Sequence, residues 1–399
     1  MSTDTTDLPA FPLARQCPYQ PAAGYQELQG EAPIRKVRLF DGKPTWLVTG
    51  YEQARALLAD QRVSSDRGNP NFPNFAPAVA ILRRARASAP SVLIGTDAPE
   101  HGRQRRMVIP SFAVRRIAAL KPGIQRIVDA RLDAMEEHGG PIDLVASYAL
   151  PIPSMVICEL LGVPYADHEF FEEKSRLRLD EERGPAAFME LREYLDNLIK
   201  AKQANPGDGL LDDLIAEQTK QGRLDREELV AFAIVLLIAG HDTTANVITL
   251  GTAALLENPE QLAALRADPE LIPAAVEELL RYVSLVSALP RVAKEDIEIG
   301  GEVIRAGDSM MIGLASANYS ADFVARPDDL DIHRASRHHV AFGYGIHQCL
   351  GQNLARAELE IAFRSLLSRF PELRLAKPVD QLEIRAGFIA GVVDLPVSF

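Results

Sequence analysis

The longest helical segment that the sequence predicts begins after Asp225 and runs to about Leu256. Asp225 and Glu228 have the spacing of a helix N-terminal capping box, and Pro259 terminates the segment. Its first part, residues 229–238, is apolar on every side, which is typical of a helix buried in a core. At about 1.5 Å of rise per residue, such a helix crosses a whole domain. The rest of the chain must therefore pack around it.

Polar groups interrupt this apolar helix at Ala239-Gly-His-Asp-Thr-Thr244. Polar groups deep in an apolar helix raise the free energy of the folded state unless they have partners or a function. Two explanations are open. Either the threonine hydroxyls bond back to carbonyls of the preceding turn while Gly240 loosens the helix, or these groups serve a reaction beside the helix.

A glycine-rich loop, Phe342 to Gly351, delivers a single cysteine to the start of another predicted helix. The apolar residues that follow recur at helical spacing: Leu350, Leu354, Ala357 and Ile361. We expect the unpaired N–H groups of that helix start to lower the pKa of the Cys349 thiol, which favours a metal-binding thiolate. The loop also lacks side chains where a flat, bulky partner could approach its backbone, at Gly343, Gly345 and Gly351.

Cys349 has no second cysteine nearby in the sequence. It therefore cannot build a zinc or iron–sulfur site, because those need about four protein ligands at short spacing. It can be the only protein ligand of a haem iron, whose other ligands come from the porphyrin. Taken alone, a single cysteine is more often a structural residue packed in the core.

The surrounding residues distinguish these two explanations. Phe342, Gly345, Cys349 and Gly351 form the pattern Phe-x-x-Gly-x-x-x-Cys-x-Gly, with His347 two places before the cysteine. This pattern resembles the haem-binding signature of the cytochrome P450 superfamily. The polar hexapeptide of the long helix resembles the oxygen-activation motif of the same family at every position. Because both motifs occur in the family order, the chain resembles the soluble bacterial, actinobacterial-type members.

The resemblance implies a mainly α cytochrome P450 fold, a triangular prism of helices with a small β-rich lobe. Residues 1–399 would form a single haem-thiolate monooxygenase domain, with residues 1–30 as an irregular N-terminal lead. The implied cofactor is haem b, iron protoporphyrin IX with the Cys349 thiolate as its ligand, held between the long helix and the cysteine loop. The thiolate would favour O–O cleavage by pushing electron density to the iron.

The resemblance also assigns roles within the long helix. Cleaving the O–O bond of reduced dioxygen consumes two protons, and Thr243 and Asp242 would deliver them. Gly240 would leave room for dioxygen. A haem-thiolate sensor or carrier would not need this acid–alcohol pair, and a peroxide-driven haem enzyme typically lacks it. Both alternatives stay open, and the pair favours a monooxygenase.

Further residues follow from the family pattern. His101 and Arg105 lie four residues apart, hence on one helix face, and would bind a haem propionate together with Arg291. Glu278 and Arg281 match the structural Glu-x-x-Arg element of the family. The family usually adds a third polar partner to this element, and Arg334 and His333 are both candidates for it.

The span from His101 to Lys121 contains six Lys or Arg residues and no acid. In an acidic protein such a patch could steer an acidic electron donor by complementary charge. The implied donor is ferredoxin, reduced from NAD(P)H by a separate reductase. The alternative is a solvated helix face, and it applies equally to Arg103, Arg106, Arg115 and Arg116.

The residues expected to line a substrate pocket are mostly apolar. They come from an irregular stretch between Asn69 and Ile94, from the long helix, from a strand after residue 285 and from a C-terminal turn. We expect a lipophilic substrate, either a secondary metabolite or a xenobiotic. For the irregular stretch, ordinary loop packing remains an equal alternative. The candidates are Phe72, Phe75, Val92, Ile94, Leu236, Ala239, Leu289, Phe388 and Ile389.

Composition excludes other classes of protein. The 399 residues contain no linker or repeat, and 43 basic against 55 acidic residues give a net charge of −12, which argues against a nucleic-acid partner. The three cysteines are far apart, as in a reducing compartment. The N-terminus lacks the features of a signal peptide, and the longest apolar run, Leu229 to Ala239, is shorter than the about 20 residues that a bilayer requires. We therefore expect a cytoplasmic protein without a membrane anchor.

Overall fold

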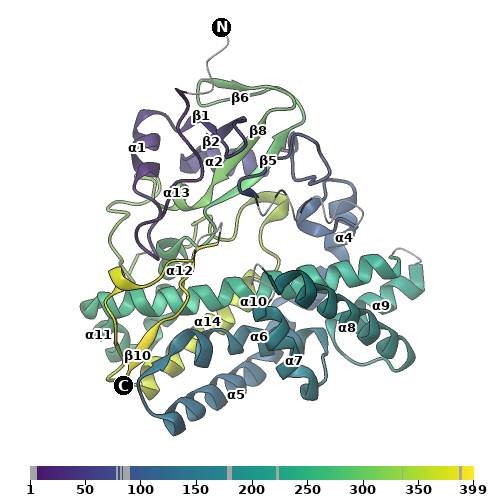
Figure 1. Cartoon of the computed structure of the whole chain (residues 1–399), viewed down its shortest axis with the longest axis vertical. Coiled ribbons are helices and arrows are strands. Elements are labelled where there is room, and N and C mark those ends of the chain that lie inside the picture. The colour runs from purple at the N-terminus through teal and green to yellow at the C-terminus, as the bar shows by residue number, and fades with distance from the viewer. Residues whose placement is uncertain are drawn as a thin grey trace.

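Helices form one side of the molecule and a smaller β-rich lobe forms the other (Figure 1). The structure is a computed structural model, and it describes residues 7–399 except 78–79, 81–82, 84–89, 178–181, 222–223, 335 and 386–388. Helix α10, Arg226–Glu257, runs across the middle of the molecule in Figure 1. Its predicted capping box is present, since the Asp225 carboxylate accepts from Glu228 N at 2.8 Å and the Glu228 carboxylate accepts from Asp225 N at 2.9 Å.

Most of α10 is buried among other helices in one large apolar core. By length and composition alone it could cross a membrane, with a mean hydropathy of 1.5, but 67% of its most apolar window is buried inside the protein. This burial is typical of a core helix, as the sequence predicts. The helices that contribute to the same core include α5 (Val114–His138), α6 (Pro151–Leu161), α8 (Gly184–Ala204), α12 (Ile272–Val283) and α14 (Gln352–Arg369).

The β-rich lobe contains a five-stranded sheet in the order β1-β2-β8-β5-β3. Strands β1 and β2 form an antiparallel hairpin that turns at Gly42, where φ is positive at 81°. Strand β8 pairs parallel to β2 and antiparallel to β5, which brings the segment after α12 beside the N-terminal hairpin. The strands are β1 (Ile34–Arg38), β2 (Pro44–Val48), β3 (Val63–Ser64), β5 (Ala288–Ala293) and β8 (Ser309–Gly313).

Smaller elements complete the described chain. Strands β6 (Ile297–Ile299) and β7 (Glu302–Ile304) form a short hairpin. A three-stranded sheet joins β4 (Ile142–Asp143), β10 (Pro396–Ser398) and β9 (Arg374–Leu375). The remaining helices are α1 (Gly24–Glu31), α2 (Tyr51–Ala59), α4 (Glu100–Val108), α7 (His168–Leu177), α9 (Leu210–Gln221), α11 (Pro259–Ala267) and α13 (Leu314–Asn318).

One predicted boundary was wrong. The lead is not irregular throughout, because α1 forms within it and buries Tyr25 and Leu28 against the sheet. Helix α5 begins at Val114, although most side chains of its first turns are exposed and Pro122 lies within it. In α1 and at the start of α5, packing against the rest of the fold stabilises a helix that the local sequence pattern does not clearly predict.

An acidic side chain is buried in α14. Glu358 is 3% exposed, burial raises its pKa to about 8, and its Oε2 has no hydrogen-bond partner among the described residues. The folded state therefore binds an extra proton between the ordinary glutamate pKa of 4.5 and about 8, so this residue stabilises the fold less as pH rises through that window.

We expect Glu358→Gln to reduce by more than half the loss of stability between about pH 5 and about pH 9, because the amide cannot ionise. Urea unfolding at both pH values measures this difference. Glu372→Gln, at an exposed position, should leave the parent pH dependence unchanged. An unaltered pH dependence in Glu358→Gln would show that this carboxyl group is not the one that titrates.

Candidate active site

Cys349 lies in the loop immediately before α14, as predicted. Its backbone N–H donates to Phe342 O at 2.8 Å, which closes the loop into a compact turn. The loop also has a positive φ at Gly343 and at Gly345, of 69° and 71°. Gly351 caps α14, and its N–H donates to the cysteine sulfur. The sequence therefore presents one sulfur, with a backbone donor, at the start of a helix.

The glycines of the loop differ in their surroundings. A Cβ on Gly345 would overlap the carbonyl oxygen of Leu58 at the end of α2. At Gly343 and Gly351 the nearest atoms to such a Cβ lie 3.9 Å away, in Leu289 and Phe112, which is ordinary contact. Gly345 is therefore needed for its backbone conformation and its contact with α2. That these glycines also clear space for a bulky partner stays a prediction.

The predicted lowering of the pKa of the Cys349 thiol was wrong for the protein by itself. Burial raises the pKa of Cys349, and the Gly351 N–H and the positive charges of Arg105 and Arg356 offset this only in part. The increase in pKa caused by desolvation of the thiolate is larger than the decrease caused by the N–H groups at the helix start. A bound metal ion reverses this balance, because a coordinating thiol is deprotonated outright.

An accessible stripe follows one face of α10 in its middle turns. Ala239 is exposed, and Ala231, Val235 and Thr243 are half-buried, although most of their neighbours are buried. The spacing of four residues places all of them on one side of the helix. The stripe is apolar except at Thr243, whose hydroxyl donates to Ala239 O at 2.7 Å while the helix continues unbroken. The back-bonding explanation thus holds, and the hydroxyl oxygen is still accessible.

Gly240 has a packing role in the same turn. A Cβ at this position would lie 3.3 Å from Cδ1 of Ile157 in α6, so the missing side chain allows α6 and α10 to approach closely. This contact accounts for the glycine without reference to dioxygen, and the expected role in making room for dioxygen has no direct support here.

Asp242 is 7% exposed and lies beside the stripe. Its side chain has His241 as a neighbour, with Nε2 3.9 Å from Oδ1. Its backbone carbonyl accepts from Asn246 Nδ2 at 2.6 Å. Asn246 was not identified from the sequence, where nothing distinguishes it from other polar residues of the helix.

Four predicted cofactor-binding residues lie together. The imidazole rings of His101 in α4 and His347 in the cysteine loop have centroids 4.0 Å apart. Arg105, one turn after His101, donates to Gln348 O at 2.8 Å, which attaches α4 to the loop. Arg291 of β5 is 7% exposed and lies within electrostatic reach of His347.

This cluster has an excess of positive charge. Burial, and to a lesser degree the charge of Arg67, lowers the pKa of Arg291 to about 10. Burial, followed by the charges of His101 and Arg291, lowers the pKa of His347 to about 3. His347 Nδ1 is buried and has no hydrogen-bond partner in the part of the chain that the structure describes. Arg67 was missed in the sequence, because it comes from a distant loop.

The acidic neighbour of the cluster, Asp97, does not balance it. Its carboxylate already accepts from Ser64 Oγ at 2.6 Å and from Ser65 N at 2.7 Å. Buried cations are stabilised by carboxylates that can accept their hydrogen bonds. The cluster therefore fits the two propionates of a haem, and the single sulfur of Cys349 fits its iron. The described residues contain no other group of metal-ligating side chains.

Two buried networks hold the cysteine loop and the segment before it. In the first, burial raises the pKa of Glu277, but the His339 imidazole, with Nε2 3.2 Å from the carboxylate, and hydrogen bonds from Arg356 outweigh that effect and lower the pKa to about 2. Arg356 also lies 4.7 Å from the ring centroid of Phe342. This network joins α12, the loop and α14, and it was not predicted.

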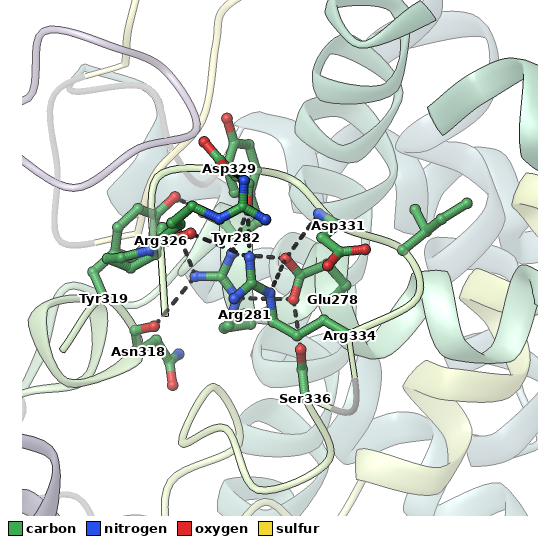
Figure 2. A network of polar contacts seen from close by, with 12 residues as sticks. Glu278, Arg281, Tyr282, Asn318, Tyr319, Arg326, Asp329, Asp331, Arg334 and Ser336 are labelled. Carbon is green, nitrogen blue, oxygen red and sulfur yellow. Dashed lines mark hydrogen bonds and ion pairs between the residues drawn. The ribbon is translucent and has the colours of Figure 1, made fainter. Parts of the chain in front are cut away.

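The second network is the predicted pair of Glu278 and Arg281, shown in Figure 2. Both side chains are fully buried, and Arg281 donates to the Glu278 carboxylate through Nε and Nη2, each at 2.8 Å. Arg334 is the third partner, with Nε 3.2 Å from Glu278 Oε1. For the other candidate, His333, the structure gives a hydrogen bond from its backbone N–H to Asp331. Ser336 Oγ also donates to Glu278, at 2.5 Å.

The predicted pocket residues occupy different environments. Ile94 is 47% exposed, whereas Val92 and Leu236 are 4% and 8% exposed and belong to the core. Leu289 approaches the cysteine loop at Gly343, and Ile389 pairs with Val286. Phe388 lies outside the described residues.

Two of the loop candidates favour the alternative of ordinary packing. Phe72 is 7% exposed and lines a cavity of about 220 Å³ beside the β1–β2 turn, together with Leu39 and Gly307. Phe75 packs against the sheet cluster that includes Ala288 and Met311. Neither contact involves the stripe of α10.

Two arginines of the basic stretch in α4 and α5 bond to other groups of the chain. Arg103 pairs with Glu100 and Glu228, and Arg116 donates to Asp208 O. Arg106 and Arg115 are exposed on the surface. Exposed apolar side chains accompany them at Ile109 and Val114.

Comparison with known proteins agrees with this geometry. Residues 176–393 match the family model described as Cytochrome P450. Over 98% of its length, the chain is 54% identical to pentalenic acid synthase of Streptomyces avermitilis, of which it covers 97%. The chain belongs to the cytochrome P450 family. It is also similar to the vitamin D3 dihydroxylase of Streptomyces griseolus, at 50% identity over 99% of this P450 and 98% of that protein.

The fold of this P450 is found in solved structures as well. Cytochrome P450 MoxA from Nonomuraea recticatena superposes with a TM-score of 0.93 at 46% identity, covering 98% of each chain. The mainly α P450 fold with its small sheet, the haem b cofactor held by a cysteine thiolate, and oxygenating activity are thereby confirmed for this chain. It is a P450 monooxygenase.

Proposed function

We propose that this P450 inserts one oxygen atom from dioxygen into a C–H bond of a lipophilic small molecule, a secondary metabolite or xenobiotic, in the cytoplasm. Electrons would come from NAD(P)H through ferredoxin reductase and ferredoxin. The observation that supports this best is the accessible stripe of α10, apolar along its length and ending at Thr243 beside Asp242. When bound, the haem supplies dioxygen activation, and the chain's own residues supply binding, orientation and protons.

The cofactor would be held at two places. Cys349 would provide the iron ligand from a loop that Phe342 and Gly351 keep in shape through backbone hydrogen bonds. The arginines and imidazoles clustered around His347 would hold the propionates: His101, Arg105, Arg291 and His347. Their excess charge in the protein alone supports this assignment, because anionic carboxylates would satisfy it.

Proton delivery would use the turn that follows the stripe. Thr243 already donates its hydroxyl hydrogen to Ala239 O, so its oxygen lone pairs are available to accept a hydrogen bond from water or reduced dioxygen. Asp242, mostly buried next to it, would relay protons from solvent toward that hydroxyl. The buried walls on either side of the turn would exclude bulk water.

A lipophilic substrate agrees with the side chains of the stripe. Ala231, Val235 and Ala239 are small or branched apolar residues. Among the other pocket candidates, Ile94 is an apolar side chain with 47% exposure. Two relatives are named pentalenic acid synthase and vitamin D3 dihydroxylase. Arg106 and Arg115, with Ile109 and Val114 beside them, would form the docking surface for an acidic ferredoxin.

Replacing Thr243 with valine tests the proton role. Valine keeps the shape of threonine but has no hydroxyl, so NAD(P)H should still be consumed while product per NAD(P)H falls by about tenfold or more. The diverted electrons should appear as hydrogen peroxide. Peroxide released per NAD(P)H, with a ligand chosen by its spectral shift of the haem, measures this effect.

The helix offers a matched control for this variant. Thr249 makes the same back-bond, to Ala245 O at 2.9 Å, but it is 1% exposed and lies away from the stripe. Thr249→Val should therefore remain coupled, and Thr243→Ser, which keeps the hydroxyl, should remain largely coupled. Equal peroxide release from Thr243→Val and the parent would show that the hydroxyl has no part in proton delivery.

A further inference from the structure

The last part of the chain folds into a hairpin whose described arms are residues 383–385 and 389–393 (the C-terminal hairpin). Backbone hydrogen bonds join the arms, from Arg385 N to Gly391 O and from Val393 N to Glu383 O, both at 3.0 Å. The hairpin is also attached to the segment between α12 and β5, because Ala390 N donates to Leu285 O at 2.8 Å. Its position relative to α12 is therefore fixed by main-chain contacts.

A side chain from this hairpin reaches α10. Arg385 Nη2 donates to Asn246 Oδ1 at 2.6 Å, across 139 residues of sequence. Asn246 is 6% exposed, and its amide nitrogen donates to the backbone carbonyl of Asp242 at 2.6 Å. Two consecutive hydrogen bonds thus lead from the hairpin to the turn that carries Asp242 and Thr243.

Two threonines of α10 show only the second kind of bond. Thr249 and Thr252 donate to the carbonyls of Ala245 and Ile248, one turn earlier. For Asn246, in contrast, a side chain from a different part of the fold holds the acceptor oxygen. Because the amide oxygen is fixed by Arg385, the amide nitrogen is oriented toward Asp242 O.

Gly391 lies against the hydrogen-bonded side chains of Arg385 and Asn246. A Cβ on Gly391 would overlap both Arg385 Nη2 and Asn246 Oδ1. Gly391 is not among the glycines with a positive φ, so its backbone conformation does not require glycine. The hydrogen bond between Arg385 and Asn246 is therefore the feature that excludes a side chain there.

We propose that Arg385 is a positioning residue for proton delivery: through Asn246 it fixes the Asp242 carbonyl, and so couples the docking of the C-terminal hairpin to the geometry of the Asp242–Thr243 turn. This inference rests on the proposed role of that turn in dioxygen chemistry. A ligand that contacts the hairpin near Ile389 would then also influence how tightly the proton-delivering turn is held.

The test compares holoenzyme variants that break the two hydrogen bonds separately. Arg385→Met removes the first donor and leaves Asn246 free to rotate. Asn246→Asp keeps an acceptor for Arg385 but replaces the donor to Asp242 O, so the hairpin stays attached while the second bond is lost. Arg374→Met, at an exposed arginine of β9, is the matched control.

Hydrogen exchange of the peptide covering residues 239–247 is measured first, in the resting holoenzyme. Arg385→Met and Asn246→Asp should each speed exchange there by about tenfold, as expected for loss of one buried hydrogen bond. Arg385→Lys should restore protection in part. Exchange of the Ala390 amide should rise in Arg385→Met and stay at the parent level in Asn246→Asp.

Peroxide released per NAD(P)H is the second measurement. Both variants and Gly391→Ala should release at least about twice as much as the parent, and Arg374→Met should not. Coupling through Asp242 is overturned if Asn246→Asp behaves like the parent in both measurements, or if Arg385→Met behaves like Arg374→Met. Failure of the proposed function would be distinct: the parent would then show no ligand-dependent NAD(P)H oxidation, while the exchange measurement would still test the link.

Discussion

Cys349→Ser is expected to abolish monooxygenase turnover, by at least about a thousandfold, or about 4 kcal/mol in the activation free energy. Serine has nearly the size of cysteine, so the Phe342 carbonyl should still accept the backbone hydrogen bond that closes the loop. What is lost is the thiolate, which favours O–O cleavage by donating electron density to the iron. The ferrous–CO complex should lose the absorption position that is characteristic of thiolate ligation.

Cys17→Ser is the control for this substitution. Cys17 is half-buried in the N-terminal lead and far in the sequence from the loop. Its variant should keep the thiolate-type spectrum and the parent turnover. If Cys349→Ser retained that spectrum, the iron ligand would have to be sought elsewhere in the chain.

Glu278→Ala is expected to destabilise the fold by about 3–5 kcal/mol, because it leaves the guanidinium of Arg281 buried without its counter-charge. Both side chains are fully buried, and the carboxylate also binds Arg334 and Ser336. Figure 2 shows that these groups converge on the Glu278 carboxylate from α12 and the segment before the cysteine loop. The free energy of unfolding, from chemical denaturation monitored in the far-ultraviolet, measures the change.

An exposed ion pair provides the comparison. Glu270 lies 3.3 Å from Arg364, but its side chain is 85% exposed. Glu270→Ala should therefore lower the stability by less than about 1 kcal/mol. An equally small loss in Glu278→Ala would mean that the buried network does not hold this part of the fold.

Sequence patterns predicted the features of this P450 that depend on local chemistry. The capping box at Asp225, the burial of α10 and the position of Cys349 before a helix depend on neighbouring residues, and all are present. The residues that would bind the propionates lie together as expected, although their binding role is still a prediction. Family motifs supplied that assignment, and the residue spacing alone did not.

The sequence did not predict features that require distant segments to meet. Arg67, Asn246 and Glu277 have no local pattern that distinguishes them, and their partners come from other elements. The pKa of Cys349 was predicted in the wrong direction, because the helix start is a local effect and burial is a property of the whole fold. The contact of Gly345 with Leu58 is likewise not visible in the sequence.

The way Arg281 recognises its surroundings has a consequence for sequence divergence. Apart from Glu278, its hydrogen-bond acceptors are main-chain oxygens, of Asn318, Pro327 and Asp329. A main-chain carbonyl is present whatever the side chain. Substitutions between Asn318 and Asp329 should therefore preserve the hydrogen bonds of Arg281 as long as the backbone keeps its conformation. Insertions or deletions between Asn318 and Asp329, which displace the carbonyls themselves, should be tolerated far less well than any exchange of residue type.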